Sequence, residues 1–475
     1  MKRSQDRILT THVGSLPRPD SLLELSSYGK GPPKDPQEYA RRVREAVADI
    51  VKQQAQVGLD IVNDGEFGKE SWANYILKRI SGFEIRPSDL RPLEWLGRDR
   101  ERFRELIAQE LPHVLTGSPT EACVAPIKYT DSRAIDQAID NLAAALRPVN
   151  IAEAFMTAVA PASTAYDGVN EFYPNERDYV FAIADALRTE YQAIHKAGLV
   201  LQVDDAVLAN MYDALTQKSP QRYREWAELR VEALNRALEG IPEDRVRYHV
   251  CFGSWHVPHV SDAPLEDIVD LIVRVRAGAY SIEAANPRHE HEWRVWEKVK
   301  LPPGRILIPG VITHHIITVE HPRVVADRIV RFARIVGREN VIAGTDCGFA
   351  QVDSIKRVHP KVMWAKFESL VEGARIASRE LWGKARAGSS VRHEPVRPAR
   401  PARAARTAGG ARTAASARSA GSSRSAASAR AARASRGARG GPRARTSGSA
   451  TKRKGRPART ARKAGHARNA RRARK

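Results

Sequence analysis

The chain has 475 residues, of which 78 are Lys or Arg, 55 are Asp or Glu and only three are Cys, and its formal net charge is +23. Residues 384–475 contain 28 of the basic residues and a single acidic one, Glu394, so the first 383 residues carry a net charge of −4 and have the composition of an ordinary globular segment. The cysteine count excludes a disulfide framework, no apolar run is long enough to span a membrane, and polar residues at 4–6 argue against a signal peptide, so we expect a cytoplasmic protein.

Helix and strand patterns alternate along residues 1–383. Asp35 and Pro36 predict the start of a helix, apolar spacing continues it over 38–57, and Gly58 predicts its end. Similar patterns predict helices over 176–198, 263–277 and 320–336, each with a glycine at or just beyond its end. Because a short β-branched run follows most of these glycines, the order predicts βα units with a parallel sheet.

Nine short runs are predicted to be strands. They are 10–14, 59–63, 122–129, 154–159, 199–204, 246–252, 279–283, 305–311 and 341–345. An eight-stranded barrel uses eight strands, and 122–129 follows a long irregular stretch, so we expect that run to be accessory. The predicted fold class is therefore an α/β TIM (β/α)8 barrel over 1–383. A doubly wound open sheet is the alternative, but no glycine-rich phosphate loop follows the first strand.

Four residues at the ends of three predicted strands form a plausible zinc-binding set. His249 and Cys251 are two apart in one strand, so their side chains point to the same side. Glu283 ends a second strand and Cys347 ends a third. Imidazole, carboxylate and thiolate are ligands that Zn²⁺ prefers, and zinc could hold a substrate thiol as its thiolate. A single buried Cys or His is more often a core residue, so the prediction depends on all four together.

Several motifs, taken with this set, resemble the C-terminal catalytic barrel of the cobalamin-independent methionine synthases. They span most of 8–350 and are Thr11-His12-Val13-Gly14-Ser15-Leu16-Pro17, Asp64-Gly65-Glu66, Gln202-Val203-Asp204-Asp205, His249-Val250-Cys251, Ser281-Ile282-Glu283, Pro309-Gly310-Val311 and Asp346-Cys347-Gly348. The resemblance implies a zinc-dependent methyltransferase of the single-barrel type. Its expected reaction is that of a 5-methyltetrahydropteroyltriglutamate–homocysteine S-methyltransferase in methionine biosynthesis.

The resemblance also assigns roles to residues around the metal. Gly14 and Ser15 would hold the substrate amino acid, and Glu66 and Asp204 would pair with its ammonium group, although strand-end acids also serve as helix caps or in surface ion pairs. His315 lies near the position of the general acid that protonates the leaving nitrogen. Thr313-His314-His315 replaces the family's Asp-x-His arrangement, so His314 is a rival for that role.

The alkyl donor and the role of the basic segment stay open at this point. Full-length members of the family use a second, N-terminal barrel to help bind methyltetrahydrofolate, whereas the motifs here begin at Thr11. Single-barrel relatives include enzymes that take a methyl group from a corrinoid and others that add coenzyme M to epoxides. Residues 384–475 have no aromatic, Leu or Ile side chain, so we expect a disordered tail. The tail could be a solvated extension, or it could bind nucleic acid non-specifically, which defines an alternative function of another class.

Overall fold

Eight parallel strands form the centre of the structure, a computed structural model that describes residues 1–383 except 27–30, 167 and 255 and the side chains of 113 and 114. The strands are β1 (Leu9–Thr10), β2 (Ile61–Val62), β5 (Glu153–Val159), β7 (Val200–Asp205), β8 (Val246–Val250), β9 (Ala279–Ile282), β10 (Ile306–Ile312) and β11 (Ile342–Thr345). Their order is β1-β11-β10-β9-β8-β7-β5-β2. All eight overlap predicted strands, although β1 shares only Thr10 with the predicted run 10–14, and the TIM-type α/β barrel is confirmed. The segment 384–475, with the disorder and polyanion binding predicted for it, lies outside the described residues.

The carboxylate of Asp60 helps to close the barrel between its first and last strands. The backbone N–H of Asp60 donates to the carbonyl of Thr10 at 3.2 Å, and the Asp60 side chain accepts from the Thr10 N–H at 2.8 Å. Thr11 Oγ1 donates to the carbonyl of Ile61 at 3.1 Å. These bonds join the ends of β1 and β2, which are not paired as a regular ladder.

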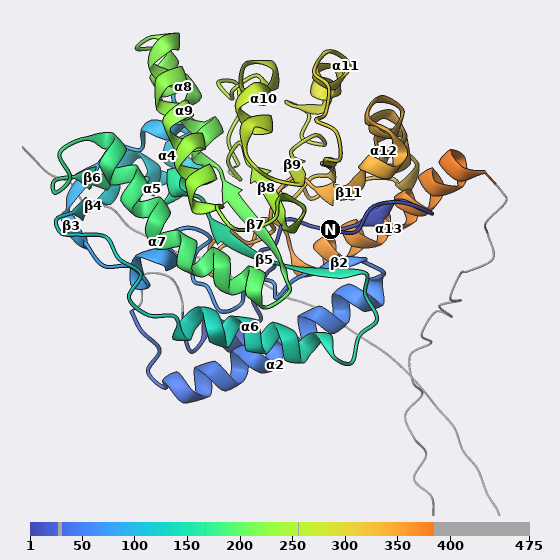
Figure 1. Cartoon of the computed structure of the whole chain (residues 1–475), viewed down its shortest axis with the longest axis horizontal. Coiled ribbons are helices and arrows are strands. Elements are labelled where there is room, and N and C mark those ends of the chain that lie inside the picture. The colour runs from blue at the N-terminus through green and yellow to red at the C-terminus, as the bar shows by residue number, and fades with distance from the viewer. Residues whose placement is uncertain (27–30, 167, 255, 384–475) are drawn as a thin grey trace, which may run out of the picture. The chain divides into compact units, whose positions relative to one another are not determined.

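Helices surround the strands, as Figure 1 shows. Asp35 caps the second helix by accepting from the N–H groups of Gln37 and Glu38, and Gly58 ends it with a φ of 98°. The predicted helix 263–277 is shorter, because Pro264 precedes its first turn and Val275 is already extended. The helices are α1 (Asp20–Leu23), α2 (Pro36–Val57), α3 (Asp99–Arg102), α4 (Arg104–Glu110), α5 (Pro112–Thr116), α6 (Arg133–Leu146), α7 (Glu176–Lys196), α8 (Val207–Thr216), α9 (Pro220–Ala237), α10 (Leu265–Arg274), α11 (Val295–Lys298), α12 (Pro322–Val336) and α13 (Pro360–Trp382).

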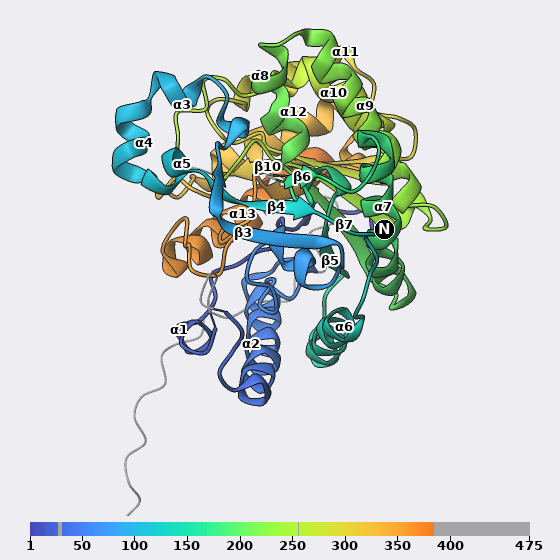
Figure 2. The ribbon, with the colours of Figure 1, turned by 90° about the vertical axis from the view of Figure 1, so that its left-hand side faces the viewer.

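A small second sheet stands beside the barrel, where Figure 2 shows it in front of the strands and next to α3, α4 and α5. It consists of β3 (Phe83–Arg91), β4 (Ser118–Cys123) and β6 (Gly168–Asn170), with β3 antiparallel and β6 parallel to β4. β4 takes the place of the predicted accessory strand 122–129 but shares only Ala122 and Cys123 with it. It ends at Cys123 rather than at 129, and Pro126 in the remainder lacks the N–H that a strand ladder uses.

Apolar side chains fill the N-terminal half of the barrel. One buried cluster takes residues from the beginnings of most strands: Leu9, Ile61, Phe155, Val200, Ala279, Ile306, Ile308 and Ile342. Above it the buried guanidinium of Arg247 donates to Thr11 Oγ1 and to the carbonyl of His12, both at 3.0 Å. The predicted site residues His249, Glu283 and Cys347 lie instead at or just beyond the C-terminal ends of their strands, the face that carries active sites in such barrels. Among the described residues, no helix is both long enough and apolar enough to cross a membrane.

Candidate active site

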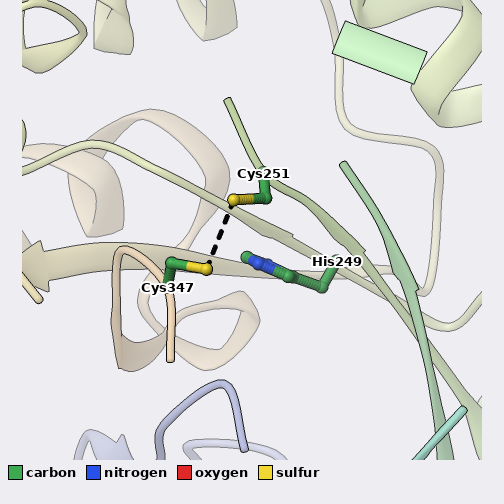
Figure 3. A group of neighbouring side chains, drawn as sticks. All are labelled: His249, Cys251 and Cys347. Atoms are coloured by element: carbon green, nitrogen blue, oxygen red, sulfur yellow. Dashed lines mark hydrogen bonds between the residues drawn. The ribbon is translucent and has the colours of Figure 1, made fainter. Parts of the chain in front are cut away.

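Three of the predicted zinc ligands lie together at the C-terminal edge of the barrel. His249 belongs to β8, Cys251 follows the last residue of that strand, and Cys347 lies two residues beyond β11. One ligand atom from each residue lies within 4.8 Å of the others, and the two Sγ atoms are 3.3 Å apart. Figure 3 shows the imidazole of His249 and the two thiols pointing toward one another. The parallel strands therefore bring residues about one hundred positions apart into one cluster.

The chemistry of this cluster fits a metal ion of the zinc type. All three side chains are buried, and Nε2 of His249 has no hydrogen-bond partner among the described residues. The other ring nitrogen, Nδ1, lies 3.3 Å from Ser281 Oγ, a contact that would fix the orientation of the ring. A buried polar atom without a partner is costly, and a cation bound by one imidazole and two sulfurs would satisfy it.

The pKa shifts of the two thiols also favour a bound cation. Burial opposes ionisation of Cys347, but hydrogen bonding from Cys251 and the neighbouring His249 outweigh it and hold the pKa of the Cys347 thiol well below its ordinary value. Ser254 Oγ also donates to Cys347 Sγ at 2.8 Å. Contact with Cys347, followed by burial, raises the pKa of Cys251 well above its ordinary value. Two sulfurs in contact therefore share a single negative charge unless a cation joins them.

Glu283, the fourth predicted ligand, lies at the border of the cluster. It is the first residue after β9, and its Oε1 is 3.5 Å from Cys251 Sγ. The same oxygen accepts from the N–H of Phe252 at 3.1 Å. Burial, reinforced by Asp346 and Cys347, raises the pKa of Glu283 to about 8. The carboxylate is thus close enough to reach an ion by a small side-chain movement, but it is not one of the three clustered ligands.

A cavity of about 380 Å³ opens beside the sulfurs. Its wall contains three acidic side chains, Glu66, Asp204 and Asp205, near His249. Aromatic and aliphatic side chains form another part of the wall: Trp72, Leu93, Trp95, Tyr166, Val352 and Ile355. The rings of Trp72 and Tyr166 are nearly parallel, at 19°, with centroids 6.4 Å apart. A site of this size, with a few polar groups set in an apolar wall, is typical of small-molecule binding.

Glu66 and Asp204 form a buried acidic pair that calls for a cation. Glu66 has a φ of 61°, unusual for a residue other than glycine, and its Oε2 has no hydrogen-bond partner among the described residues. Lys69 lies 3.7 Å from Oε1 of Glu66, beyond hydrogen-bond distance. Burial raises the pKa of Asp204 to about 7, with Glu66 adding to the shift and His249 opposing it. An ammonium group between the two carboxylates would give Glu66 Oε2 a hydrogen-bond donor and would favour the charged form of Asp204.

The predicted pair Gly14 and Ser15 divides between the cavity wall and the layer behind it. Ser15 lines the cavity together with Val13, whereas Gly14 is not among the lining residues. Gly14 has a φ of 145°, and a Cβ added to it would lie 2.7 Å from Thr157 Cγ2 and 3.6 Å from Glu66 Oε1. The glycine therefore permits the close approach of the segment after β1 to Thr157 and Glu66.

His314 and His315 both lie outside the lining of the cavity. His314 is fully buried, and neither of its ring nitrogens has a hydrogen-bond partner among the described residues. His315 is partly buried, and its ring lies 5.8 Å from that of His256 and 6.2 Å from that of His259. Burial, followed by repulsion from His259 and His256, lowers the pKa of His315 to about 4. The ring is therefore neutral at pH 7 in this conformation.

Sequence patterns did not identify two polar residues of the loop between β11 and α13. Arg357 lines the cavity, and its Nε donates to Gln351 Oε1 at 2.8 Å. The amide nitrogen of Gln351 lies 3.8 Å from Cys347 Sγ and also donates to the carbonyl of Gly348. The cysteine in Asp346-Cys347-Gly348 is the one local indication that the loop after it borders a site.

A family profile, related sequences and a solved structure all relate the chain to one family. A family profile described as "Cobalamin-independent synthase, Catalytic domain" matches residues 8–89 and 163–366. The chain is 24% identical over 394 residues to a methionine synthase of Thermococcus kodakarensis, covering 81% of this chain and 98% of that protein. It is 26% identical over 375 residues to a methionine synthase of Saccharolobus islandicus, covering 78% and 95%. A B12-independent methionine synthase from Shewanella sp. W3-18-1, solved with selenomethionine, has the same fold, with a TM-score of 0.61 and 18% identity over 79% of this chain and 99% of that chain.

Proposed function

Because the chain belongs to the cobalamin-independent methionine synthase family, with the family's catalytic domain over most of its described residues, we propose that it transfers a methyl group from a methyltetrahydropteroylglutamate to the sulfur of homocysteine. The observation that carries the proposal is the position of the acidic pair Glu66 and Asp204 in the same cavity wall as the His249, Cys251 and Cys347 cluster. A small molecule with a thiol at one end and an ammonium group at the other would satisfy both the cluster and the acidic pair. We further propose that residues 1–383 are the catalytic unit, that 384–475 is a disordered basic tail, and that the enzyme is cytoplasmic.

In this proposal His249, Cys251 and Cys347 hold a zinc ion, with Glu283 as the fourth, exchangeable ligand. Bound zinc would keep the substrate sulfur as a thiolate at neutral pH, where a free thiol with a pKa of about 8.5 is mostly protonated. Glu66 and Asp204 orient the substrate through its ammonium group, and Ser15 holds it from the β1 side. The aromatic wall excludes water from the sulfur and receives the methyl donor.

We assign the proton required by the leaving nitrogen of the donor to His315, with His314 as the alternative. His315 is neutral in the described conformation, so it has to take up a proton before it can donate one. Its ring neighbours are His256, which is exposed, and His259, which is buried. Movement of the loop that follows β10 would then bring the ring of His315 to the cavity.

Turnover and metal content measured on one preparation test the proposed function. We expect about one equivalent of zinc per chain and formation of methionine from homocysteine and methyltetrahydropteroyltriglutamate. Methylcobalamin as the donor, and coenzyme M with an epoxide, serve as parallel reactions. Methionine formation only with methylcobalamin, or alkylation only of coenzyme M, would refute the proposed substrates while leaving the metal assignment intact.

Exchange of the Glu283 oxygen for the substrate sulfur is a separate expected result. Four protein ligands would close a tetrahedral site, whereas catalysis needs an open position. Glu283 would be the one oxygen ligand, and it lies at the border of the cluster, so we expect its carboxylate to give way to the substrate thiol. X-ray absorption at the zinc edge should show two sulfur neighbours in the free enzyme and three with homocysteine. An unchanged sulfur count on addition of the thiol would contradict the exchange.

A further inference from the structure

Glu66 lines the cavity with one of its carboxylate oxygens already bound by the protein. Its Oε1 accepts from the hydroxyl of Thr157, a residue of β5 with 1% of its surface exposed. Its Oε2 has no hydrogen-bond partner among the described residues, so this is the oxygen left for a ligand. Thr157 is not among the residues that line the cavity, so it would act on a ligand through the carboxylate of Glu66.

The hydroxyl of Thr157 is itself oriented by the ammonium group of Lys69. Lys69 Nζ donates to Thr157 Oγ1 at 2.8 Å and to the carbonyl of Thr157 at 2.7 Å. An ammonium group can only donate, so it uses an acceptor site of the hydroxyl and leaves the single hydroxyl hydrogen for Glu66. The hydrogen bond from Thr157 to Glu66 therefore has a fixed direction.

Lys69 is held on another side by the ring of Tyr75. Its Nζ lies 4.4 Å from the centre of that ring, which is a cation–π contact. The hydroxyl of Tyr75 donates to Glu190 Oε1 at 2.6 Å, and this bond orients the ring. The contacts with Thr157 and Tyr75 thus keep Lys69 Nζ at 3.7 Å from Glu66 Oε1, beyond hydrogen-bond distance.

Two buried side chains of opposite charge therefore lie close together without a direct hydrogen bond. Lys69 has 6% of its side chain exposed and Glu66 has 2%. A direct, hydrogen-bonded pair would occupy the carboxylate, and the ammonium group of a ligand would have to displace Lys69 before it could bind. The hydroxyl of Thr157 takes the place of that bond, because it gives Glu66 a donor and Lys69 an acceptor.

We propose that Thr157 is a positioning residue that keeps Glu66 available to the ammonium group of an amino thiol, because its hydroxyl lies between the carboxylate and the internal ammonium group of Lys69. This inference rests on the proposed function and adds a residue that selects the substrate without touching it. Asp204, the other acid of the pair, is held differently, since its Oδ1 accepts from the neutral amide of Gln202 at 2.7 Å. Competition between an internal and an external ammonium group is therefore expected at Glu66.

The test removes the hydroxyl of Thr157 and compares two thiols on the zinc-loaded full-length chain. In Thr157→Val, Lys69 and Glu66 each lose a partner and can pair directly with each other. We therefore expect KM for homocysteine to rise roughly 10- to 100-fold, the effect of one hydrogen bond to a charged group. The value of kcat, the zinc content and kcat/KM for 4-mercaptobutyrate, which lacks the ammonium group, should stay the same. Thr157→Ser, which keeps the hydroxyl, should behave as the wild type.

Two further variants separate this role from a general effect on folding. Thr10→Val removes another buried hydroxyl, which donates to Asp60 Oδ2 at 3.0 Å. Thr10 does not line the cavity, so this variant should keep the wild-type KM for homocysteine. In a Glu66→Gln background, Thr157→Val should cause no further change in KM for homocysteine, because a residue that acts through the charge of Glu66 then has no charge to act on.

Several results would overturn this inference. They are a wild-type KM for homocysteine in Thr157→Val, an equal loss with 4-mercaptobutyrate, a Thr157→Ser variant as impaired as Thr157→Val, and full additivity with Glu66→Gln. Calorimetric binding of the two thiols makes the same comparison without a methyl donor, and a wild type that binds both equally, or neither, would also refute the inference. A wild type that binds homocysteine in preference to 4-mercaptobutyrate but forms no methionine would instead refute the proposed function and leave the inference in place.

Discussion

Replacement of Cys251 by serine is expected to abolish methyl transfer and to release zinc from the protein. The Cys251 Sγ lies 3.3 Å from that of Cys347 and belongs to the three-residue cluster, so a serine hydroxyl removes one of two soft anionic ligands. Loss of even an outer partner of a metal ligand costs about 10- to 100-fold in affinity, and loss of a ligand should exceed that. Competition with a chromophoric chelator measures the affinity, and methionine formation measures the activity.

The third cysteine of the chain offers a matched control for this substitution. Cys123 is buried in the accessory sheet at the end of β4, where its Sγ lies 3.6 Å from the carbonyl of Ala125, away from the cluster. Cys123→Ser makes the same chemical change and should retain zinc and turnover. If Cys251→Ser keeps a full equivalent of zinc and its activity, the metal assignment is wrong. If both variants lose zinc, the effect is one of folding.

The cluster of His249, Cys251 and Cys347 could be predicted from the sequence because its geometry is mostly that of regular strands. His249 and Cys251 share a side of one strand, and a parallel barrel places the end of every strand on the same face. The position of Cys347 then follows from the fold. The distance from the Glu283 carboxylate to the cluster could not be predicted from the fold. The residue lies past the end of β9, and its side-chain rotamer decides whether its oxygen contacts the cluster.

Loops and insertions account for what the sequence did not predict. Arg357 and Gln351 approach the sulfurs through the path of an irregular loop, for which no periodic pattern exists. Most side chains of β3 are exposed, so the apolar alternation that identifies a half-buried strand is absent there. His315 follows β10 as expected, but its pKa is lowered by burial and then by His259 and His256, which belong to another loop.

Neutralising the acidic pair is expected to remove the selectivity of the enzyme for a thiol that carries an ammonium group. Asp204→Asn and Glu66→Gln keep the size of each side chain and remove its charge. Breaking a buried, hydrogen-bonded ion pair costs about 3–5 kcal/mol, so kcat/KM for homocysteine should fall roughly 10²- to 10⁴-fold. The analogue 4-mercaptobutyrate, which lacks the ammonium group, should be used equally poorly by wild type and variants. Glu70→Gln is the matched control, because Glu70 pairs with Lys78 at 2.7 Å and does not line the cavity.

The pH dependence of kcat/KM tests whether the negative charge of Asp204, rather than the size of its side chain, is required for use of homocysteine. Burial raises the pKa of this carboxyl to about 7, so it loses its charge as the pH falls through 7, and a protonated carboxyl cannot pair with an ammonium group. In the wild type, kcat/KM for homocysteine should therefore decrease about tenfold per pH unit below 7, since this ratio reports the ionisation of the free enzyme. This decrease in kcat/KM below pH 7, the acidic limb of the profile, should be absent in Asp204→Asn. It should also be absent when the wild type acts on 4-mercaptobutyrate, whose thiol ionises similarly but which has no ammonium group to pair with Asp204. A limb that persists in both cases would assign the titration to the metal-bound thiol, and the acidic pair would then have no part in selecting the substrate.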